Sequence, residues 1–196
     1  MAVEGPEASR LLGASLGPSP SKREPGVGTA CVYFKADRAP RQGPMLYLNG
    51  EVSAGWKGPS SRRPREREPA VSLQGSGLVN NCCFPSEVAA SYAPPGKTLV
   101  SVSTVGVPAL GDAELAAAVK SELSQWFGAG EVSNWQLLRV YRIPYAQPPQ
   151  SPPTDLRRPV ALGNGLFVCG DHRDAATLEG ALTSGKRAAQ ALLASN

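Results

Sequence analysis

The sequence has a single histidine, His172, and only four cysteines among its 196 residues. One histidine leaves little from which to build a Ser/His/Asp triad, a Cys/His pair or a metal centre, so no metal site is expected. The cysteines have no C-x-x-C spacing and lie at Cys31, Cys82, Cys83 and Cys169. We therefore expect reduced thiols in an intracellular compartment rather than a disulfide framework or a zinc site.

Long apolar runs and targeting signals are also missing. No stretch approaches the roughly 20 apolar residues that a membrane helix needs, so no membrane span is expected. The first residues carry Glu4 and Glu7 and have neither a signal-peptide core nor the Arg- and Ser-rich composition of a transit peptide. The sequence therefore predicts no targeting peptide and an intracellular location.

Proline and glycine are abundant, with 19 and 21 residues, and hydrophobic residues make up 41% of the chain. This composition is typical of a globular protein with loop-rich parts. Much of the net charge of +4 lies in residues 52–74, which hold five basic and two acidic residues and show no apolar period. We expect this basic insert to be disordered. No aromatic residue is interleaved among Arg62 to Arg67, so nucleic acid is not an expected partner.

Alternating apolar residues predict a sheet in the middle of the chain. Strands are expected over 29–35, 45–49, 78–84 and 97–105. The first two are expected to pair antiparallel with each other. Read across the basic insert, residues 46–51 also join residues 75–81 as a hairpin with a Gly-rich turn. This continuity suggests the hypothesis that 52–74 is a retained intron, and transcripts that always contain these codons would argue against it.

A helix is predicted over Asp112–Phe127 and is expected to cover this sheet. Asp112 can cap its first free N–H groups, and Gly128 follows its last residue. Apolar side chains recur at helical spacing and mark its buried stripe: Leu115, Val119, Leu123, Trp126 and Phe127. Trp126 is therefore interpreted as a core residue rather than a substrate contact.

The main functional signal lies at the carboxyl end of the chain. Residues 166–169 form a short continuous apolar run, which is typical of a strand covered on both faces, as in a parallel sheet. Gly170 lets the backbone turn, and Asp171 places a carboxylate just past the strand. In open α/β sheets this edge is where ligands bind. A helix is predicted to begin near Thr177, whose side chain can cap it.

The terminal helix has a predicted buried face and a predicted polar face. Its apolar positions recur at three- and four-residue steps: Leu178, Ala181, Leu182, Gly185, Ala189 and Leu192. Lys186, Arg187 and Gln190 are expected to face water. Gly180 and Gly185 each cost about 1 kcal/mol of helix propensity relative to Ala. We therefore expect both to allow the close approach of a neighbouring backbone or ligand.

Residues 168–171, Val-Cys-Gly-Asp, followed by residues 178–186, Leu-Glu-Gly-Ala-Leu-Thr-Ser-Gly-Lys, resemble the carboxyl-terminal flavin motif of the FAD-dependent amine oxidase and phytoene desaturase-like oxidoreductase superfamily. In that family the Asp hydrogen-bonds the ribityl chain, and the start of the next helix lies against the flavin ring or its phosphates. The resemblance implies FAD as the cofactor. It implies these cofactor-binding residues and no catalytic one: Gly170, Asp171, Leu178, Glu179 and Gly180. The amides and dipole of a helix N-terminus favour electron-rich groups, in agreement with that role.

The resemblance also implies how the chain is divided. Residues 1–14 would end a segment of the FAD domain, residues 27–148 would form the substrate domain, and residues 160–196 would give the last strand and helix of a Rossmann-like FAD domain. The expected fold class is therefore an α+β fragment with a mixed or antiparallel sheet and a covering helix. His172 and Tyr145 could lie near the cofactor, but we expect an exposed turn histidine and a packed loop tyrosine.

The implied function is an FAD-dependent oxidoreductase that oxidises a small or hydrophobic substrate by hydride transfer to flavin. The sequence lacks the strand, G-x-G-x-x-G and helix that open such proteins. We therefore expect a carboxyl-terminal portion that needs the amino-terminal FAD-domain half and binds FAD weakly or not at all by itself. Plastid residence is expected from family analogy alone. The alternative is a non-enzymatic interaction module or an inactive fragment, with the basic loop as a partner-binding element.

Overall fold

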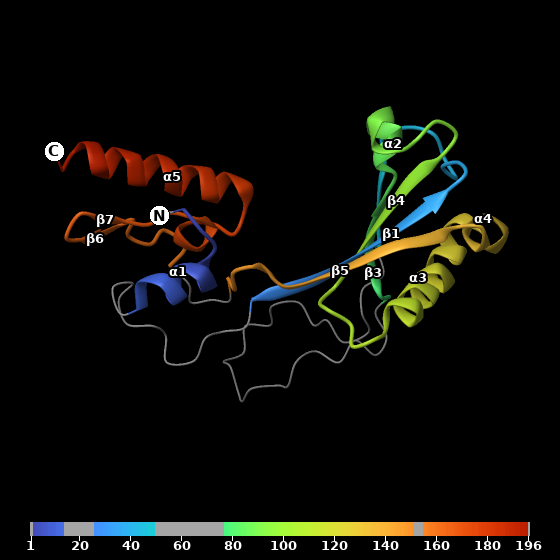
Figure 1. Cartoon of the computed structure of the whole chain (residues 1–196), viewed down its shortest axis with the longest axis horizontal. Helices are drawn as coiled ribbons and strands as arrows, with labels where there is room; N and C mark the ends of the chain where they lie inside the picture. Colours follow the sequence, from blue (N-terminus) through green and yellow to red (C-terminus); the bar gives the residue numbers. More distant parts are fainter. Residues whose placement is uncertain (1, 14–25, 50–76, 151–154, 196) are drawn as a thin grey trace, which may run out of the picture. The chain divides into compact units, whose positions relative to one another are not determined.

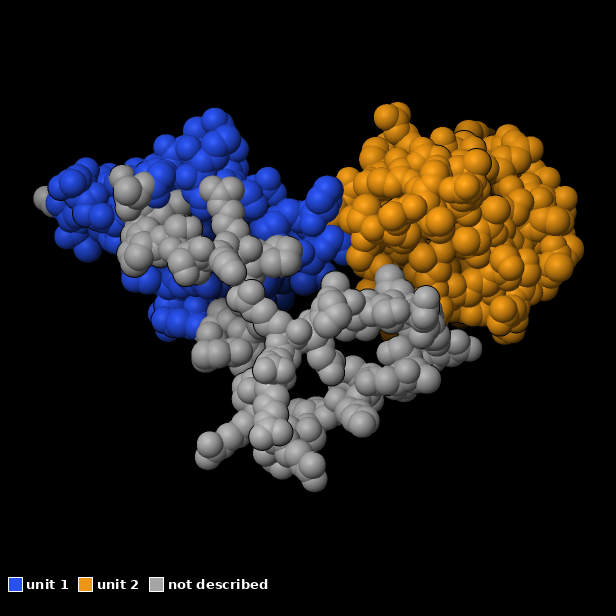
Figure 2. All heavy atoms as spheres, turned by 90° about the horizontal axis from the view of Figure 1, so that it is seen from below, with its two compact units in different colours: residues 1–28, 144–196 blue, residues 29–143 orange. Residues whose placement is uncertain are grey.

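The computed structural model describes residues 2–13, 26–49, 77–150 and 155–195. The chain divides into two compact units: residues 1–28 with 144–196 form unit 1, and residues 29–143 form unit 2 (Figure 2). The basic insert that was predicted to be disordered lies outside the described residues. The assignment of the chain's parts to an FAD domain and a substrate domain stays a prediction.

Unit 2 is built on a five-stranded sheet with the strand order β2-β3-β4-β1-β5 (Figure 1). The strands are β1 (Val27–Ala36), β2 (Leu46–Leu48), β3 (Val79–Cys83), β4 (Thr98–Thr104) and β5 (Gln136–Gln147). The pairs β1 with β4, β2 with β3 and β3 with β4 are all antiparallel. An α+β fold with an antiparallel sheet is therefore confirmed.

The antiparallel pairing expected across the basic insert is confirmed, because Leu46 lies opposite Cys83 and Leu48 opposite Asn81. The Gly-rich turn predicted for this hairpin lies outside the described residues. The predicted pairing of the first two strands with each other is wrong. The neighbours of β1 in the sheet are β4 and β5. In both β1 and β4 every second side chain is buried, so pairing them aligns two long rows of core residues. The three-residue β2 offers no such row.

The helix α3 (Asp112–Phe127) covers one face of this sheet. Its buried residues Leu115, Val119 and Leu123 join the buried side chains of β1, β3 and β4 in one core. Trp126 packs against the edge of that core and is only partly buried. The helix has the predicted extent, but the cap lies one residue earlier than predicted. Gly111 is the N-cap residue, and its N–H donates to the Glu114 carboxylate at 3.0 Å.

A carboxylate on α3 ties this helix to the edge of the sheet. Glu122 accepts hydrogen bonds from the backbone N–H groups of Leu78 at 2.7 Å and Val79 at 3.2 Å. It also accepts one from the side-chain amide of Asn49 at 3.2 Å. Three donors from the two chain segments that flank the basic insert therefore meet at one side chain. The shorter helices α2 (Pro85–Val88) and α4 (Ala129–Ser133) complete unit 2.

Unit 1 contains α1 (Gly5–Leu12), the hairpin β6 (Ala161–Gly163) and β7 (Leu166–Phe167), and α5 (Leu178–Leu193). The strand predicted over 166–169 is shorter than expected and pairs antiparallel with β6. The positive φ angles of Gly163, Asn164 and Gly165, 87°, 51° and 72°, explain the tight hairpin.

A parallel contact also occurs in unit 1, where Ala2 and Cys169 form an isolated parallel bridge. Among the described residues this bridge is the only parallel pairing in unit 1. The Rossmann-like character of this part therefore stays a prediction. In the described residues, none of the helices is long and apolar enough to cross a membrane.

The helix α5 has the predicted start but not the predicted buried face. Its buried residues are Gly180, Ser184 and Ala188, which are spaced by four and are all small. Leu178 and Leu182, predicted to be buried, are 80% and 63% exposed. Small side chains let the helix approach the turn that precedes it, and this close contact determines which face is covered. The apolar period alone could not reveal this preference.

Candidate functional site

The candidate site lies in unit 1, where the chain leaves Cys169, turns at Gly170 and passes through a single 3₁₀ turn, Asp171–Arg173, before α5. Gly170 has a φ angle of 149°, which side-chain-bearing residues rarely adopt. A Cβ at Gly170 would lie 2.6 Å from the carbonyl oxygen of Val3. Only glycine fits at this position.

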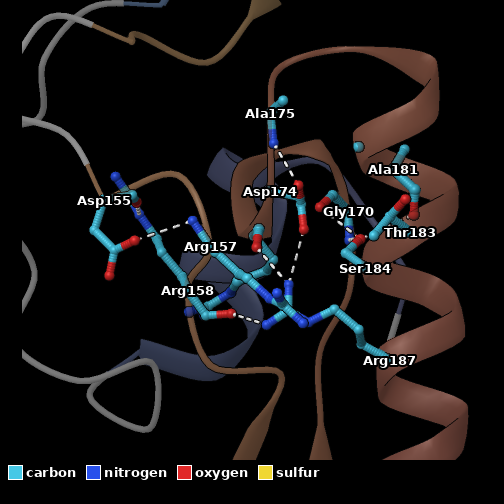
Figure 3. Close-up of polar contacts among 12 residues, drawn as sticks. Asp155, Arg157, Arg158, Gly170, Asp174, Ala175, Ala181, Thr183, Ser184 and Arg187 are labelled. Carbon is cyan, nitrogen blue, oxygen red and sulfur yellow. Dashed lines mark hydrogen bonds and ion pairs between the residues drawn. The ribbon is translucent and has the colours of Figure 1, made fainter.

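Ser184 of α5 fastens this turn to the helix (Figure 3). Its hydroxyl accepts a hydrogen bond from the Gly170 N–H at 2.9 Å and lies 2.8 Å from the Gly170 carbonyl oxygen, to which it can donate. The Ala181 carbonyl, also at 2.8 Å, is a second acceptor for the same hydroxyl hydrogen. Because Ser184 is fully buried, these bonds are shielded from water. The backbone that leads into Asp171 is thereby held against α5.

The start of α5 is defined by a side-chain cap and a close backbone contact. The Thr177 hydroxyl accepts a hydrogen bond from the Gly180 N–H at 3.0 Å, which confirms the predicted cap. A Cβ at Gly180 would lie 1.9 Å from the Ala175 carbonyl oxygen, so the close approach predicted there is confirmed. The same prediction is wrong for Gly185, where a Cβ would meet nothing within 4 Å.

Arg187 joins three segments around the turn, although it was predicted to face water. Its guanidinium pairs with the Asp174 carboxylate at 3.0 Å and donates to the Arg158 carbonyl at 2.7 Å (Figure 3). It also donates to the Arg173 carbonyl at 3.2 Å. The helix, the 3₁₀ turn and the segment before β6 are thus connected through one side chain. The guanidinium fork suits this role because it presents several donors in a fixed plane.

The Asp171 carboxylate sits at the start of the 3₁₀ turn and is 29% exposed. Among the described residues it accepts no hydrogen bond. The ring nitrogen Nδ1 of His172, a titratable group, lies 3.9 Å from its Oδ1 atom. A partly buried carboxylate with unused lone pairs can accept hydrogen bonds from a bound molecule. The hydroxyl groups of a ligand are suitable donors.

His172 is buried, and the expectation of an exposed turn histidine is wrong. Its side chain is 9% exposed, and neither ring nitrogen has a hydrogen-bond partner in the part of the chain that the structure describes. The turn folds the ring inward beside Gly5 of α1, where a Cβ would lie 3.2 Å from the His172 Cβ. Burial lowers the pKa of His172, and Arg173 lowers it further, whereas Asp171 opposes the change. The imidazole is therefore neutral near pH 7, and its contact with Asp171 is not an ion pair.

Tyr145 belongs to the same neighbourhood. A Cβ at Gly26 would lie 2.1 Å from its ring, and a Cβ at Gly5 would lie 3.3 Å from its hydroxyl oxygen. Burial raises the pKa of Tyr145, and the carboxylates of Asp171 and Glu4 raise it further. Tyr145 is a residue of β5 packed against two glycines, so the predicted packing is confirmed but the predicted loop is not.

The turn and the helix start that carry the five predicted cofactor-binding residues lie side by side in unit 1. Gly170 and Gly180 are both in close backbone contacts, whereas the side chain of Leu178 points into solvent. Within the described ranges, no three His, Cys, Asp or Glu side chains gather closely enough to hold a metal ion. The arrangement can hold a ligand through hydrogen bonds.

Sequence reasoning did not identify the residues that hold the turn in place, Ser184 and Arg187. The four-residue spacing of Gly180, Ser184 and Ala188 was a usable signal, because a row of small residues on a helix indicates a closely packed face. No sequence signal identified Arg187, since its partners are mainly backbone carbonyls from other segments.

A Gly-Asp turn fastened to the first turns of a helix, with unpaired polar groups in the turn, suits a hydroxyl-rich, electron-rich cofactor. The chain belongs to the flavin-containing amine oxidoreductase family, whose family model matches residues 19–193. The cofactor of this family is FAD. No curated protein matches the chain significantly.

Two solved structures are similar to the chain. An oxidoreductase from Methanosarcina mazei is 14% identical with a TM-score of 0.51, and the match covers 96% of this chain and 38% of that one. A protein from Pyrococcus furiosus is 14% identical with a TM-score of 0.55, and the match covers 97% of this chain and 39% of that one. The likeness concerns the fold, and the chain spans about two fifths of the length of these neighbours.

Proposed function

We propose that unit 1 supplies part of the FAD site of a flavin-dependent oxidoreductase. Asp171 would accept hydrogen bonds from hydroxyls of the ribityl chain, and Gly170 would leave room beside them. The start of α5, with Leu178, Glu179 and Gly180, would lie against the flavin or its phosphates, where the amides of the first helical turn favour negative charge.

The observation that carries this proposal is the set of unpaired polar groups in the turn after Gly170. The Asp171 carboxylate and both His172 nitrogens have no hydrogen bond among the described residues. Buried polar groups in folded proteins are nearly always paired. A cofactor with several hydroxyl and carbonyl groups fits this donor and acceptor set. His172 can donate from one ring nitrogen and accept at the other because it is neutral.

The chemistry proposed for the whole protein is the oxidation of a small or hydrophobic molecule by hydride transfer. Bound FAD supplies the hydride-accepting ring. The residues of this chain would bind the cofactor and support its site. Asp171 would orient the cofactor, while Ser184 and Arg187 keep the turn against α5.

The proposal also requires a pyrophosphate-binding element, because the sequence contains no G-x-G-x-x-G. We propose that an FAD-domain polypeptide that is not part of this chain supplies this element and completes the site. Its packing surface on this chain would include Leu178, Leu182 and Leu193 of α5, which are 80%, 63% and 76% exposed. Apolar side chains gathered on one helix are an expected place for such a partner.

The experiment titrates FAD into the isotope-labelled chain and follows the ring signals of His172, the only histidine, by NMR. We expect weak binding that shifts these signals and the backbone signals of Gly170 and Asp171. Asp171→Ala should weaken it about tenfold, the effect of one charge-assisted hydrogen bond. Asp155→Ala is the matched control, because Asp155 is an exposed aspartate of the same unit that bonds a backbone N–H. FAD-induced shifts confined to residues outside the Gly170 turn and the start of α5 would reject the assignment of this site.

A further inference from the structure

The face of the unit 2 sheet that α3 does not cover carries an apolar groove. Side chains alternate along a strand, so the buried Val32 faces α3 while its neighbours Cys31 and Tyr33 point to the other side. With Leu99 of β4 and Ile143 of β5, they line a groove of about 560 Å³. This volume lies within the range of sites that hold small molecules, about 300–1,000 Å³.

The lining of this groove includes two aromatic rings in contact. Tyr33 of β1 and Tyr141 of β5 meet edge to face, with ring centroids 5.8 Å apart. Tyr141 and Ile143 remain 48% and 40% exposed. Apolar and aromatic surface that lines a concave site gains free energy when a ligand displaces water from it. The shape and lining therefore suit a ligand with an apolar or aromatic body.

The charge of the groove comes from two arginines, Arg139 and Arg142, and no acidic residue is among the described residues that line it. Arg142 is already engaged, because it pairs with the Asp112 carboxylate and donates to the Leu110 carbonyl at 2.6 Å. Arg139 has its guanidinium carbon 5.2 Å from the centroid of the Tyr141 ring and has no ion pair among the described residues. A guanidinium free of carboxylate partners beside an apolar surface is complementary to a carboxylate.

We infer that this groove binds a small molecule with an apolar or aromatic body and a carboxylate that pairs with Arg139. An ammonium group in the same position would meet the positive charges of Arg139 and Arg142 and would be disfavoured. If the protein has the proposed function, the substrate is an apolar carboxylic acid rather than a cationic amine, and this part of the inference rests on that function. Binding itself requires neither FAD nor unit 1.

The test compares three probes that share one ring system: 2-naphthoate, 2-naphthylmethanol and 2-naphthylmethylammonium. Isothermal titration calorimetry on the full chain without FAD is expected to give the tightest binding for the carboxylate and the weakest for the ammonium. Arg139→Glu should weaken 2-naphthoate by at least about tenfold and make the ammonium the preferred probe. Arg38→Glu makes the same charge change at a surface arginine of unit 2 that does not line the groove, and it should keep the original order.

Three results would overturn the inference. The first is a wild-type chain that binds the ammonium as tightly as the carboxylate or binds none of the probes. The second is an unchanged order of affinities in an Arg139→Glu variant whose circular dichroism is that of the wild type. The third is a chain that forms a dimer by light scattering, binds no probe and becomes monomeric on Tyr141→Glu substitution. In that case a second copy of the chain would occupy the groove.

The outcome for the groove is separate from the outcome for the flavin site. Loss of probe binding with an intact FAD-induced shift of His172 rejects the groove and leaves the proposed function standing. Ordered probe binding together with FAD-induced shifts confined to residues outside the Gly170 turn and the start of α5 supports the groove as a carboxylate site and removes its role as a substrate site.

Discussion

Replacing Ser184 with Ala is expected to release the turn that carries Asp171. The Ser184 hydroxyl is fully buried and accepts a hydrogen bond from the Gly170 N–H at 2.9 Å. Alanine removes one oxygen atom, so the loss of packing is small, but it leaves the Gly170 N–H without this acceptor. An unsatisfied buried donor costs about 1–3 kcal/mol. We expect the free energy of unfolding of unit 1 to fall by about 2 kcal/mol.

The assay is urea unfolding of the labelled chain, read at the His172 ring signals because they report on unit 1 alone. Thr183→Ala is the control, since it removes a hydroxyl one position away that makes an exposed contact of 3.4 Å with the Glu179 carboxylate. This control should change the unfolding free energy by less than about 0.5 kcal/mol. A Ser184→Ala chain as stable as the control would refute the view that this hydroxyl fastens the turn.

Other perturbations test the remaining contacts. Gly180→Ala should lower the melting temperature because its Cβ would lie 1.9 Å from the Ala175 carbonyl, while Gly185→Ala, with nothing within 4 Å, should raise it; the reverse order would contradict the proposed packing. The NMR titration midpoint of His172 should lie below its ordinary value near 6.5, since burial lowers its pKa. The unfolded chain then takes up the proton first, so stability should decrease as the pH falls from about 6.5 toward the folded pKa, a loss that His172→Gln should remove. Glu122→Gln should destabilise unit 2 by about 1–3 kcal/mol in thermal unfolding, because one amide oxygen cannot serve every donor that the carboxylate serves.

Local signals in the sequence determined the elements that depend on short-range chemistry. The threonine cap at Thr177 and the apolar stripe of α3 were readable, because caps and helical periods depend on residues three or four positions apart. The pairing of the strands on either side of the basic insert was also predictable, because the break in composition indicated that these strands are neighbours. Leu46 lies opposite Cys83 in the sheet. The family motif around Gly170 and Asp171 was visible for the same reason.

Tertiary structure decided which surfaces meet. The period of α5 favoured burial of Leu178 and Leu182, yet the helix buries Gly180, Ser184 and Ala188, because only small side chains let it close on the Gly170 turn. The inward position of His172 likewise depends on the glycine backbone of α1 beside it.

The same holds for the order of the strands and for the open groove. Each strand pattern specified which side chains alternate, but several antiparallel partners would have matched the pattern of β1. Only the placement of α3 on one face of the sheet left Tyr33 and Tyr141 uncovered on the other. Contacts between residues distant in sequence depend on the shape and area of whole elements, and no local period encodes them.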